Sequence, residues 1–393
     1  MIFTTDESGK IPIKSWCEHA DEKTVGQLKA LADHPTTVLH VAAMPDAHAG
    51  LGMPIGGVIA CKDAVIPSAV GVDIGCGMCA VRTDYQDEIT EDLASMIMDA
   101  VLGTVPVGFA HNQNPEDWVG MNNIPNIPLL QDMADSTRKQ IGTLGGGNHF
   151  IELQKDQEGF VWLMVHSGSR NFGYRIAGHY MEMARKMCLQ YHSSIDLSDK
   201  NNHLAFLPQS TDQCTEYLQA MNCALDFAHE NRDRIMSKSL GVLGDFIQFS
   251  EKQRINIHHN FVASETHFGK EVWVHRKGAT QAFNGWLGII PGSMGTASYI
   301  VEGRGNRDSF MSCSHGAGRR MGRKDFMRRT KIEECEKAIV GVAFPGGWSV
   351  DRKGTVDYSE APQAYKDIDE VIAAEDDLVK VVHKLTPLGV AKG

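Results

Sequence analysis

The sequence predicts an α+β fold, and three observations support that prediction. Short apolar runs separated by glycine and proline fill residues 36–82 and return later in the chain, a pattern typical of strands joined by tight turns. Longer segments carry apolar residues at helical spacing. The predicted strands and helices do not alternate strictly, which favours mixed sheets with separate helices over a regular parallel α/β sheet.

The first predicted helices follow this strand-rich segment. Residues 87–102 begin with acidic residues and continue with an apolar stripe, and another helix is expected at about 128–141. Strands are then predicted in "TLGGGNHFIELQ" and "GFVWLMVHSGSRNFG", each attached to a glycine-rich bend. Two long helices are expected at 174–192 and 211–238, where apolar residues recur at helical spacing.

The last part of the chain is predicted to return to strands and to end with a helix and a tail. Strands are expected in "RINIHHNFVAS", "EVWVHRKGAT" and "GWLGIIPGSMGTASYIV". A basic helix is expected at about 319–337, and the last 25 residues should give an acidic helix and the tail "LTPLGVAKG". No linker divides the chain, so one domain over residues 1–393 is expected.

The composition limits the classes of function. A net charge of −11 argues against general affinity for nucleic acid, although a local basic channel can still attract phosphate over roughly a Debye length. The N-terminal "MIFTTDESGK" has no apolar signal region, and no stretch approaches the ~20 apolar residues of a membrane span. The nine cysteines show no framework spacing. We therefore expect a cytoplasmic protein with reduced thiols and no membrane association.

Polar side chains at predicted strand ends suggest a metal site. Functional side chains often project where a strand meets a turn. Imidazole and thiolate favour zinc, manganese or cobalt, and one thiolate with several histidines can bind two ions by bridging them. Spacing alone leaves open the alternative that these histidines are structural. The candidates are His149 in "GGGNHF", His166 in "VHSGSR", His259 in "HHNF", His315 in "SHGAGR", and Asp73 and Cys76 in "VGVDIGCGM".

Two neighbours of these candidates need separate interpretation. Cys79 forms a C-x-x-C pair with Cys76, but residues three apart on a strand face opposite sides, so Cys79 is expected in the core. No second pair is present to complete a zinc ribbon. His258 precedes His259, and because adjacent strand residues diverge, one of the two is expected to point away.

A loop and a histidine suggest a phosphate site. The segment "IIPGSMGTASYI" can present backbone N–H groups and Ser293 or Ser298 to a phosphate, but it matches neither the P-loop nor G-x-G-x-x-G, so a plain tight turn is the alternative. The small neighbours of His315 leave room for a bulky group on its ring. This histidine is therefore open to three interpretations: a buried hydrogen-bonding residue, a metal ligand, or a nucleophile that attacks phosphate.

Nine motifs, taken in order, resemble the RtcB family of RNA ligases: "MPDAHAGLGMPIGGV", "GVDIGCGM", "GTLGGGNHFIE", "VHSGSR", "IHHNF", "VHRKGAT", "PGSMGTASYI", "SHGAGR" and "PLGVAKG". The resemblance runs from about residue 40 to the C-terminus. It implies the α+β fold of that family and an enzyme that joins RNA ends bearing a 2′,3′-cyclic phosphate or 3′-phosphate to 5′-hydroxyl ends, in RNA repair or tRNA splicing. GTP and two manganese ions would serve a reaction that passes through a covalent histidine–GMP adduct.

The resemblance also implies roles for individual residues. His315 matches the guanylylated histidine, and Cys76 would bridge two manganese ions. Asp73 and His149 would complete one metal site, and His166 and His259 the other. The implied nucleotide contacts are Asn148, His149, Phe150, Ile151, Glu152, Asn260, Pro291, Gly292, Ser293, Met294, Ser298, His315, Gly316, Ala317, Gly318, Tyr365 and Lys392.

The chemistry of two of these residues agrees with guanine recognition. A carboxylate such as Glu152 accepts hydrogen bonds from the N1–H and 2-amino groups of guanine, and Lys392 can donate to O6. Adenine would leave these polar groups unpaired, which disfavours ATP. The sequence departs from the common pattern of the family at Asn171-Phe172, Leu51 and Met53, none of which is an implied ligand.

Local cations must hold the RNA, because the overall charge repels it. The expected RNA contacts are Arg170, Arg175, Arg276, Lys277, Arg319 and Arg323. The expected partners are GTP and RNA with the ends named above, and the chain is expected to act as a monomer. One alternative is a two-metal phosphodiesterase or nuclease, which would leave Glu152 and Lys392 without a role. Another is an inactive RNA-binding protein, which would lack a ligand or the nucleophile; none is missing here.

Overall fold

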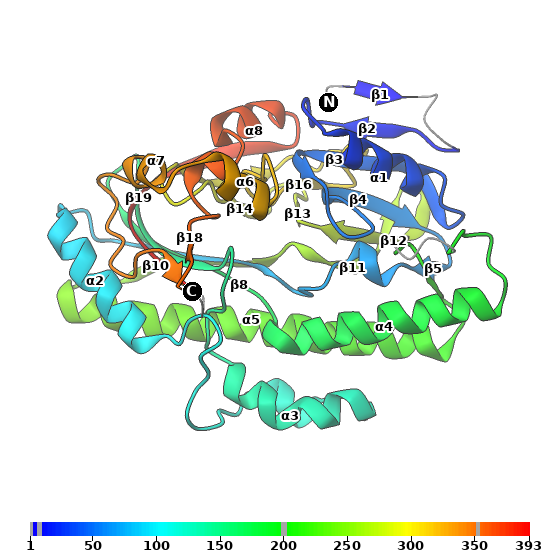
Figure 1. The fold of residues 1–393 in the computed structure, drawn as a ribbon, viewed down its shortest axis with the longest axis horizontal. Coiled ribbons are helices and arrows are strands. Elements are labelled where there is room, and N and C mark those ends of the chain that lie inside the picture. Colours follow the sequence, from blue (N-terminus) through cyan, green and yellow to red (C-terminus); the bar gives the residue numbers. More distant parts are fainter. Residues whose placement is uncertain (1–2, 6–9, 198–202, 351–353) are drawn as a thin grey trace.

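The computed structural model describes residues 3–5, 10–197, 203–350 and 354–393. Within these residues, the larger of its two main sheets has seven strands, and each neighbouring pair is antiparallel (Figure 1). In the order of hydrogen bonding across the sheet, the strands are β10 (Glu251–His258), β6 (Gly77–Thr83), β8 (Val161–Ser167), β7 (Phe150–Asp156), β19 (Val379–Lys392), β15 (Ser298–Gly303) and β14 (Leu287–Ile290).

The second main sheet is mixed, because β2 and β3 run parallel while its other neighbouring strands are antiparallel. Its strands, in order, are β1 (Phe3–Thr5), β2 (Ile13–Ser15), β3 (Thr37–His48), β4 (Ile55–Cys61), β12 (Lys270–Lys277) and β11 (Asn260–His267). Shorter pairs are formed by β5 (Ala64–Val65) with β9 (Leu207–Pro208), β13 (Ala279–Gln281) with β16 (Ser312–Ser314), and β17 (Ser349–Val350) with β18 (Val356–Asp357). His259 alone separates β10 from β11, so it joins the two main sheets.

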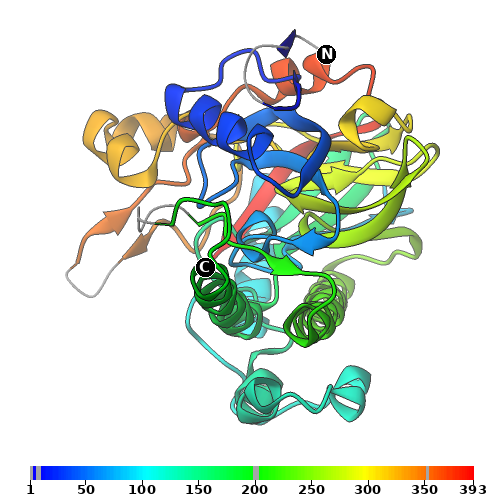
Figure 2. The ribbon, with the colours of Figure 1, turned by 90° about the vertical axis from the view of Figure 1, so that its right-hand side faces the viewer.

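Helices pack on both sides of the sheets (Figure 1). The α-helices are α1 (Glu22–Ala32), α2 (Glu91–Thr104), α3 (Pro128–Gln140), α4 (Arg170–Gln190), α5 (Asp212–Phe246), α6 (Arg323–Arg329), α7 (Ile332–Lys337) and α8 (Ile368–Ala374). The 3₁₀-helices are η1 (Pro67–Ala69), η2 (Val119–Asn123), η3 (Arg307–Ser309) and η4 (Pro362–Ala364). Figure 2 shows α6 and α7, together with β17 and β18, projecting from one side of the molecule.

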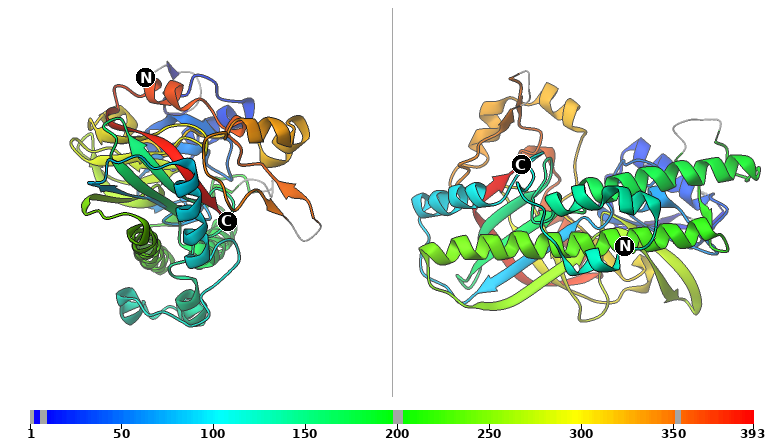
Figure 3. Two further views of the ribbon diagram at one scale, coloured as in Figure 1. Left: turned by 90° about the vertical axis from the view of Figure 1, so that its left-hand side faces the viewer. Right: turned by 90° about the horizontal axis from the view of Figure 1, so that it is seen from below.

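The long helix α5 supports the strands that carry the site. Thr211 caps its N-terminus by accepting a hydrogen bond from the Cys214 N–H. The negative charge of Asp212 in the first turn interacts favourably with the helix dipole. Its buried Ile235 and Leu243 pack with Val81 of β6 in one core. Its other core face packs against α4, and Figure 3 shows the two helices side by side from below. The turns at the ends of β6 and β8 therefore rest on a rigid base.

Most of the predicted elements are confirmed. The four helices expected after the strand-rich segment 36–82 are present as α2, α3, α4 and α5, although α5 continues to Phe246 instead of ending at 238. The acidic helix near the C-terminus is α8. The predicted strands are present in both main sheets, so the α+β prediction is confirmed. Cys79 is buried in the core beneath the larger sheet, as expected.

Three details of the prediction are wrong. The basic helix expected over 319–337 is two short helices, because Gly322 precedes α6 and the extended Thr330 and Lys331 separate it from α7. The expected tail is strand β19, and a register shift between Pro387 and Gly389 accommodates the proline. The single strand predicted in "RINIHHNFVAS" is divided at His259 between β10 and β11.

Two further observations concern the setting of the chain. Among the described residues, none of the helices combines the length and the apolar character that crossing a bilayer would require. All nine cysteines are buried free thiols.

Candidate active site

Five polar side chains converge where strands of the larger sheet end. Asp73 and Cys76 lie in the turn that leads into β6, His149 immediately precedes β7, His166 lies near the end of β8, and His259 joins the sheets. The Sγ atom of Cys76 is 3.4 Å from Nε2 of His149 and 3.3 Å from Nε2 of His166. The Nε2 atoms of His166 and His259 are 3.1 Å apart, and His149 Nε2 is 3.2 Å from Asp73 Oδ2.

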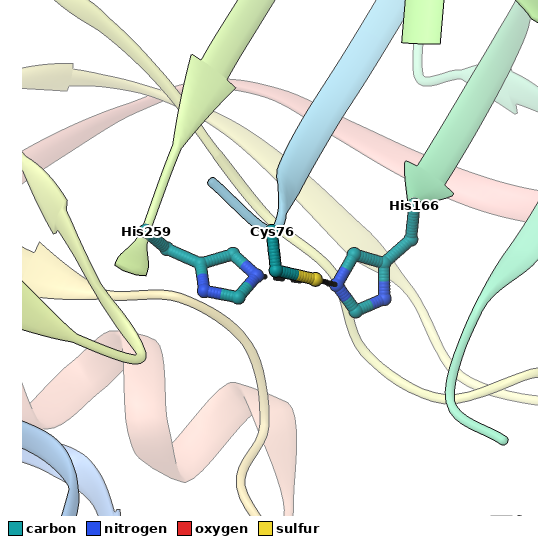
Figure 4. Close-up of side chains that lie close together, drawn as sticks. All are labelled: Cys76, His166 and His259. Atoms are coloured by element: carbon teal, nitrogen blue, oxygen red, sulfur yellow. Dashed lines mark hydrogen bonds between the residues drawn. The ribbon is translucent and has the colours of Figure 1, made fainter. Parts of the chain in front are cut away.

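These side chains form two groups that share Cys76. One group is Cys76, His166 and His259, and the other is Asp73, Cys76 and His149; within each, the donor atoms lie within 4.8 Å of one another, so each can hold a metal ion. Figure 4 shows the Cys76 sulfur between the imidazoles of His166 and His259. Imidazole, thiolate and carboxylate donors together suit a transition metal better than magnesium.

The far side of each imidazole is held in place by a backbone or amide oxygen. Nδ1 of His149 is 3.0 Å from the Leu144 carbonyl, and Nδ1 of His166 is 3.0 Å from the Asn148 carbonyl. Nδ1 of His259 is 3.2 Å from Oδ1 of Asn260. An N–H at Nδ1 that donates to such an acceptor leaves the lone pair on Nε2, the atom that faces Cys76.

The protonation states of these side chains determine what a binding cation must displace. Burial lowers the pKa of His166 and of His259 well below the usual range, so both rings are neutral near pH 7. Burial, reinforced by the charge of Asp73, raises the pKa of the Cys76 thiol. Burial acts to raise the pKa of Asp73, but its hydrogen bond and charge interaction with His149 outweigh burial and lower this pKa. A cation that binds here must displace the Cys76 proton.

Arg232 of α5 holds the turn that presents Cys76. Its guanidinium is fully buried and donates from NH1 to the carbonyl of Gly75 at 2.8 Å and to that of Ser167 at 3.1 Å. The backbone N–H of His259 donates to the Cys76 carbonyl at 2.8 Å, which ties two of the metal-capable residues together directly. Nδ1 of His258 also faces Gly75, 3.0 Å from its carbonyl, so His258 points away from the donor atoms.

His315 lies beside the metal-capable groups. Its ring centroid is 4.8 Å from that of His259. Its Nδ1 is 2.5 Å from Oδ2 of Asp46, a fully buried carboxylate on β3 that also accepts from the His315 backbone N–H at 3.1 Å. A Cβ at Gly318, where φ is +72°, would lie 2.3 Å from the Asp46 carbonyl oxygen, so the loop approaches β3 this closely only with glycine there. With Nδ1 donating to Asp46, the lone pair of the neutral ring is on Nε2.

A cavity of about 360 Å³ contains His315, both metal-capable groups except His149, and most of the predicted nucleotide contacts. Its volume is that of a small-molecule site. The predicted nucleotide contacts that line it are Asn148, Phe150, Glu152, Asn260, Pro291, Gly292, Ser293, Met294, Ser298, His315, Gly316, Ala317, Gly318, Tyr365 and Lys392. Ile151 does not line it, because alternate strand residues face opposite sides and Ile151 packs in the core below. His149 reaches only the metal-capable group.

The cavity wall combines a buried acid, Glu152, with a half-buried base, Lys392. Glu152 on β7 lies diagonally across from Lys392 on β19, since the cross-strand partners are Val390 with Glu152 and Lys392 with Phe150. Burial raises the pKa of Glu152 to about 8, against the opposing influence of a hydrogen bond from Gln154 and the charge of Lys392. The ionised form of a buried carboxyl is stabilised most by a ligand that donates N–H hydrogen bonds to it.

A second buried acid, Glu360, organises the cations of the cavity. Arg319 and Arg323 reach its Oε1 at 3.0 and 2.8 Å, Lys392 Nζ lies 3.7 Å from its Oε2, and the Tyr365 hydroxyl donates to it. Burial acts to raise the pKa of Glu360, but these cations outweigh it and hold the value at about 2. Lys392, Tyr365 and the two arginines are thereby fixed by one carboxylate.

The predicted RNA-contacting cations have different surroundings. Arg319 and Arg323 line the cavity, and the Arg323 side chain is 49% exposed. Lys277 also lines it, but its buried Nζ donates to the carbonyls of Leu51 and Ser68, and burial lowers its pKa to about 7. Arg170 lies beside His149 behind the cavity wall, with its guanidinium donating to Gly108 and Thr143.

Two further arginines lie outside the cavity. Arg175 pairs with Asp132 of α3 at 2.9 Å and is 40% exposed. Arg276 corrects the prediction: it is fully buried, and its guanidinium is bound to Glu265 and the Phe310 carbonyl, so it has no group free to meet RNA.

Two residues of the site were missed in the sequence. Asp46 is part of the quoted motif "MPDAHAG", but its contact with His315 spans 269 positions and depends on how β3 packs. Glu360 belongs to none of the quoted motifs. Its local sequence, "DYSEAP", does not indicate that Arg319, Arg323 and Lys392 surround it in the fold.

Comparison with known proteins gives a consistent result. The model of the family described as tRNA-splicing ligase RtcB matches residues 27–126 and 120–393. The chain is 38% identical to the RNA-splicing ligase RtcB of Escherichia coli K12, over all of this chain and 99% of that protein. It is 31% identical to the RNA-splicing ligase RtcB homolog 1 of Entamoeba histolytica, over 91% of this chain and 81% of that one. The tRNA-splicing ligase RtcB of Nanoarchaeum equitans is 29% identical, over 95% and 92%.

Proposed function

The chain belongs to the RtcB family of tRNA-splicing ligases, and we propose that this RNA ligase joins a 3′-phosphate or 2′,3′-cyclic phosphate end to a 5′-hydroxyl end, with GTP and two manganese ions, in RNA repair or tRNA splicing. The observation that carries the proposal is that one cavity is lined both by His315, which lies against the shared-thiolate metal site, and by Glu152 and Lys392.

The proposed metal ligands follow the two donor groups. Cys76 would bridge two manganese ions, with Asp73 and His149 on one ion and His166 and His259 on the other. The division of the five residues into two groups that share Cys76 supports this assignment. When bound, the ions supply positive charge that neutralises the phosphate under attack.

We assign His315 as the nucleophile and Asp46 as its positioning residue. Nε2 of His315 attacks the α-phosphorus of GTP, a P–N bond forms, and the bond to pyrophosphate breaks. The carboxylate of Asp46 holds the ring through Nδ1 and stabilises the positive charge that develops on it. A covalent adduct replaces one difficult exchange with two easier ones.

The RNA steps complete the cycle. Water first opens a cyclic phosphate to a 3′-phosphate. An oxygen of that phosphate attacks the phosphorus of the histidine–GMP adduct, the P–N bond breaks, and His315 is regenerated. The 5′-hydroxyl then attacks the activated 3′-phosphate, a phosphodiester forms, its proton passes to solvent and GMP leaves.

The nucleotide would lie along the cavity from His315 to Glu152. Glu152 would accept from N1–H and the 2-amino group of guanine, and Lys392 would donate to O6. Ser293 lies in the loop between β14 and β15, and Ser298 is the first residue of β15. The rest of the nucleotide would meet these two serines together with Asn148, Phe150, Asn260 and Tyr365. Their shared lining of the cavity supports this orientation.

Arg319 and Arg323 are the proposed phosphate contacts nearest the cavity, with Arg170 and Arg175 further out. The cavity takes its lining from both main sheets of one chain, which supports the single domain and the monomer that we propose. Nine buried free thiols support a reducing, cytoplasmic setting.

The test is transfer of label from α-³²P-GTP to the protein in the presence of manganese. Wild type should gain an acid-labile label, and His315→Ala should gain none. His229→Ala, which removes a half-exposed imidazole of α5 outside the cavity, is the matched control and should label like wild type.

A second assay follows ligation of a 3′-phosphate oligonucleotide to a 5′-hydroxyl oligonucleotide. A two-metal nuclease would cleave RNA without any label, and normal joining by His315→Ala would show that another residue is the nucleophile.

A further inference from the structure

Phe109 is an exposed aromatic side chain with no structural role in the fold. It lies in the loop between α2 and η2, and its side chain is fully exposed to solvent. An isolated exposed phenylalanine is unremarkable on most surfaces, but this one occupies a fixed place beside the cavity.

The backbone around Phe109 is held firmly. The N–H of Gly108 donates to the Gly145 carbonyl at 2.8 Å, and the guanidinium of Arg170 donates to the Gly108 carbonyl at 2.7 Å. The N–H of Ala110 donates to the Val107 carbonyl at 3.0 Å and closes the turn. The ring of Phe109 is therefore presented to solvent from a fixed position.

The loop that holds Phe109 is separated from His149 by one residue, Gly145. A Cβ at Gly145 would lie 1.9 Å from the Arg170 guanidinium and 2.6 Å from Nδ1 of His149, so Gly145 is packed against both. Gly108, its hydrogen-bonded neighbour, is thus one residue contact away from a proposed metal ligand.

The C-terminus reaches the same place. A Cβ at Gly393 would lie 2.7 Å from the Gly108 nitrogen, and Gly393 directly follows Lys392 in the cavity wall. Figure 1 and both views in Figure 3 show the loop after α2 passing beside the C-terminus. Arg323 also approaches this rim, since its NH2 would lie 3.4 Å from a Cβ at Gly147.

We propose that Phe109 is a stacking platform for a base of the RNA next to the reacting phosphate. The inference rests on the proposed function, because it needs RNA at the mouth of the cavity. Arg323 on the same rim is 49% exposed and can meet a phosphate, while an exposed ring offers a face on which any unpaired base can stack. The pairing of an aromatic face with a neighbouring exposed cation favours single-stranded RNA over a protein partner as its occupant.

The experiment measures binding of short single-stranded RNAs that carry either a 3′-phosphate or a 5′-hydroxyl at the tested end. Phe109→Ala should weaken binding by about tenfold, the usual effect of removing one stacking aromatic ring. Phe109→Trp should restore it, and Phe109→Leu, which keeps apolar surface without a π face, should not. The slope of affinity against salt should be unchanged in all variants, because no phosphate contact is lost.

Tyr191 provides the matched control. It is 71% exposed at the other end of α4, roughly 30 Å along the helix from Arg170. Tyr191→Ala should bind RNA like wild type. A 2-aminopurine base at the terminal position of the RNA should be quenched by wild type and should recover its fluorescence with Phe109→Ala.

Labelling with α-³²P-GTP separates this inference from the proposed function. Label on Phe109→Ala at the wild-type level, with weakened RNA binding, supports the platform. Normal labelling with unchanged RNA affinity overturns it and leaves the ligase assignment intact. A loss of self-association, seen by light scattering without a change in RNA affinity, would assign Phe109 to a protein contact and also overturn it. Absence of label on wild type would refute the proposed function itself.

Discussion

Guanine binding should depend steeply on pH, because it requires the ionised form of Glu152. The carboxyl is 2% exposed, and burial raises its pKa to about 8. In the free pocket it is mostly protonated at pH 6. The N1–H and 2-amino groups of guanine need an acceptor, so the bound state should hold a carboxylate and binding should release a proton.

The magnitude follows from that pKa. Half of the Glu152 carboxyls are ionised at pH 8 and about one in a hundred at pH 6, so the affinity should fall about 50-fold between these values. Guanosine is the suitable ligand, because it has no phosphate that titrates in this range. Calorimetry in buffers of different ionisation enthalpy measures both the affinity and the number of protons released.

Glu152→Gln is the control, since an amide cannot titrate. The variant should bind guanosine weakly and with no dependence on pH between 6 and 8. An affinity of wild type that stays constant over this range, with no proton released, would refute the assignment of Glu152 to the base.

The same shift predicts a change in stability that needs no ligand. The pKa of Glu152 in the folded state lies above its value of 4.5 in the unfolded state. Between about pH 4.5 and 8, the folded chain therefore keeps the Glu152 proton, whereas the unfolded chain has already lost it. Stability attributable to Glu152 therefore decreases as pH rises through this window. The melting temperature of Glu152→Gln should exceed that of wild type by more at pH 9 than at pH 5.

Three further predictions concern the rest of the site. Asp46→Asn keeps the size of the side chain but removes the charge that faces Nδ1 of His315, so guanylylation should slow by about 10- to 100-fold with GTP affinity unchanged; a normal single-turnover rate would exclude the positioning role. Cys76→Ala removes the donor that both groups share, so bound manganese, measured by atomic emission after gel filtration, should fall well below two ions per chain; retention of two would argue against a bridging sulfur. Arg232→Leu removes a charged donor from the buried carbonyls of Gly75 and Ser167, so the free energy of unfolding in urea should fall by about 3 kcal/mol; an unchanged midpoint would contradict that account.

The strand-end side chains could be recognised from the sequence because their context is local. Glycine within two residues of His149, His166 and Cys76 marks a turn, and a turn at the end of an apolar strand presents polar side chains. The partner that aligns His315 could not be recognised in this way. Asp46 is an interior residue of β3, and only packing of that strand against the loop before Gly318 brings it to the imidazole.

The errors at the C-terminus have a similar origin. Proline and glycine are depleted in strands, so "LTPLGVAKG" has the composition of a tail. Pairing with β7 determines the conformation of this segment instead, and the register shift after Pro387 removes the cost of its missing N–H. Phe172, one of the departures from the family pattern, packs in the core between α4 and α5. Its local sequence does not distinguish this buried position from a position that contacts RNA.

The position of His259 between β10 and β11 couples the metal-capable group to the alignment of the two main sheets. His166 and Cys76 belong to one sheet, whereas His259 is also the first step into the other. A small sliding of one sheet past the other would separate the Nε2 atoms of His166 and His259 before any strand lost its hydrogen bonds. Metal affinity should therefore report damage at the junction earlier than a melting curve does, even when the damage lies far from the ligands themselves.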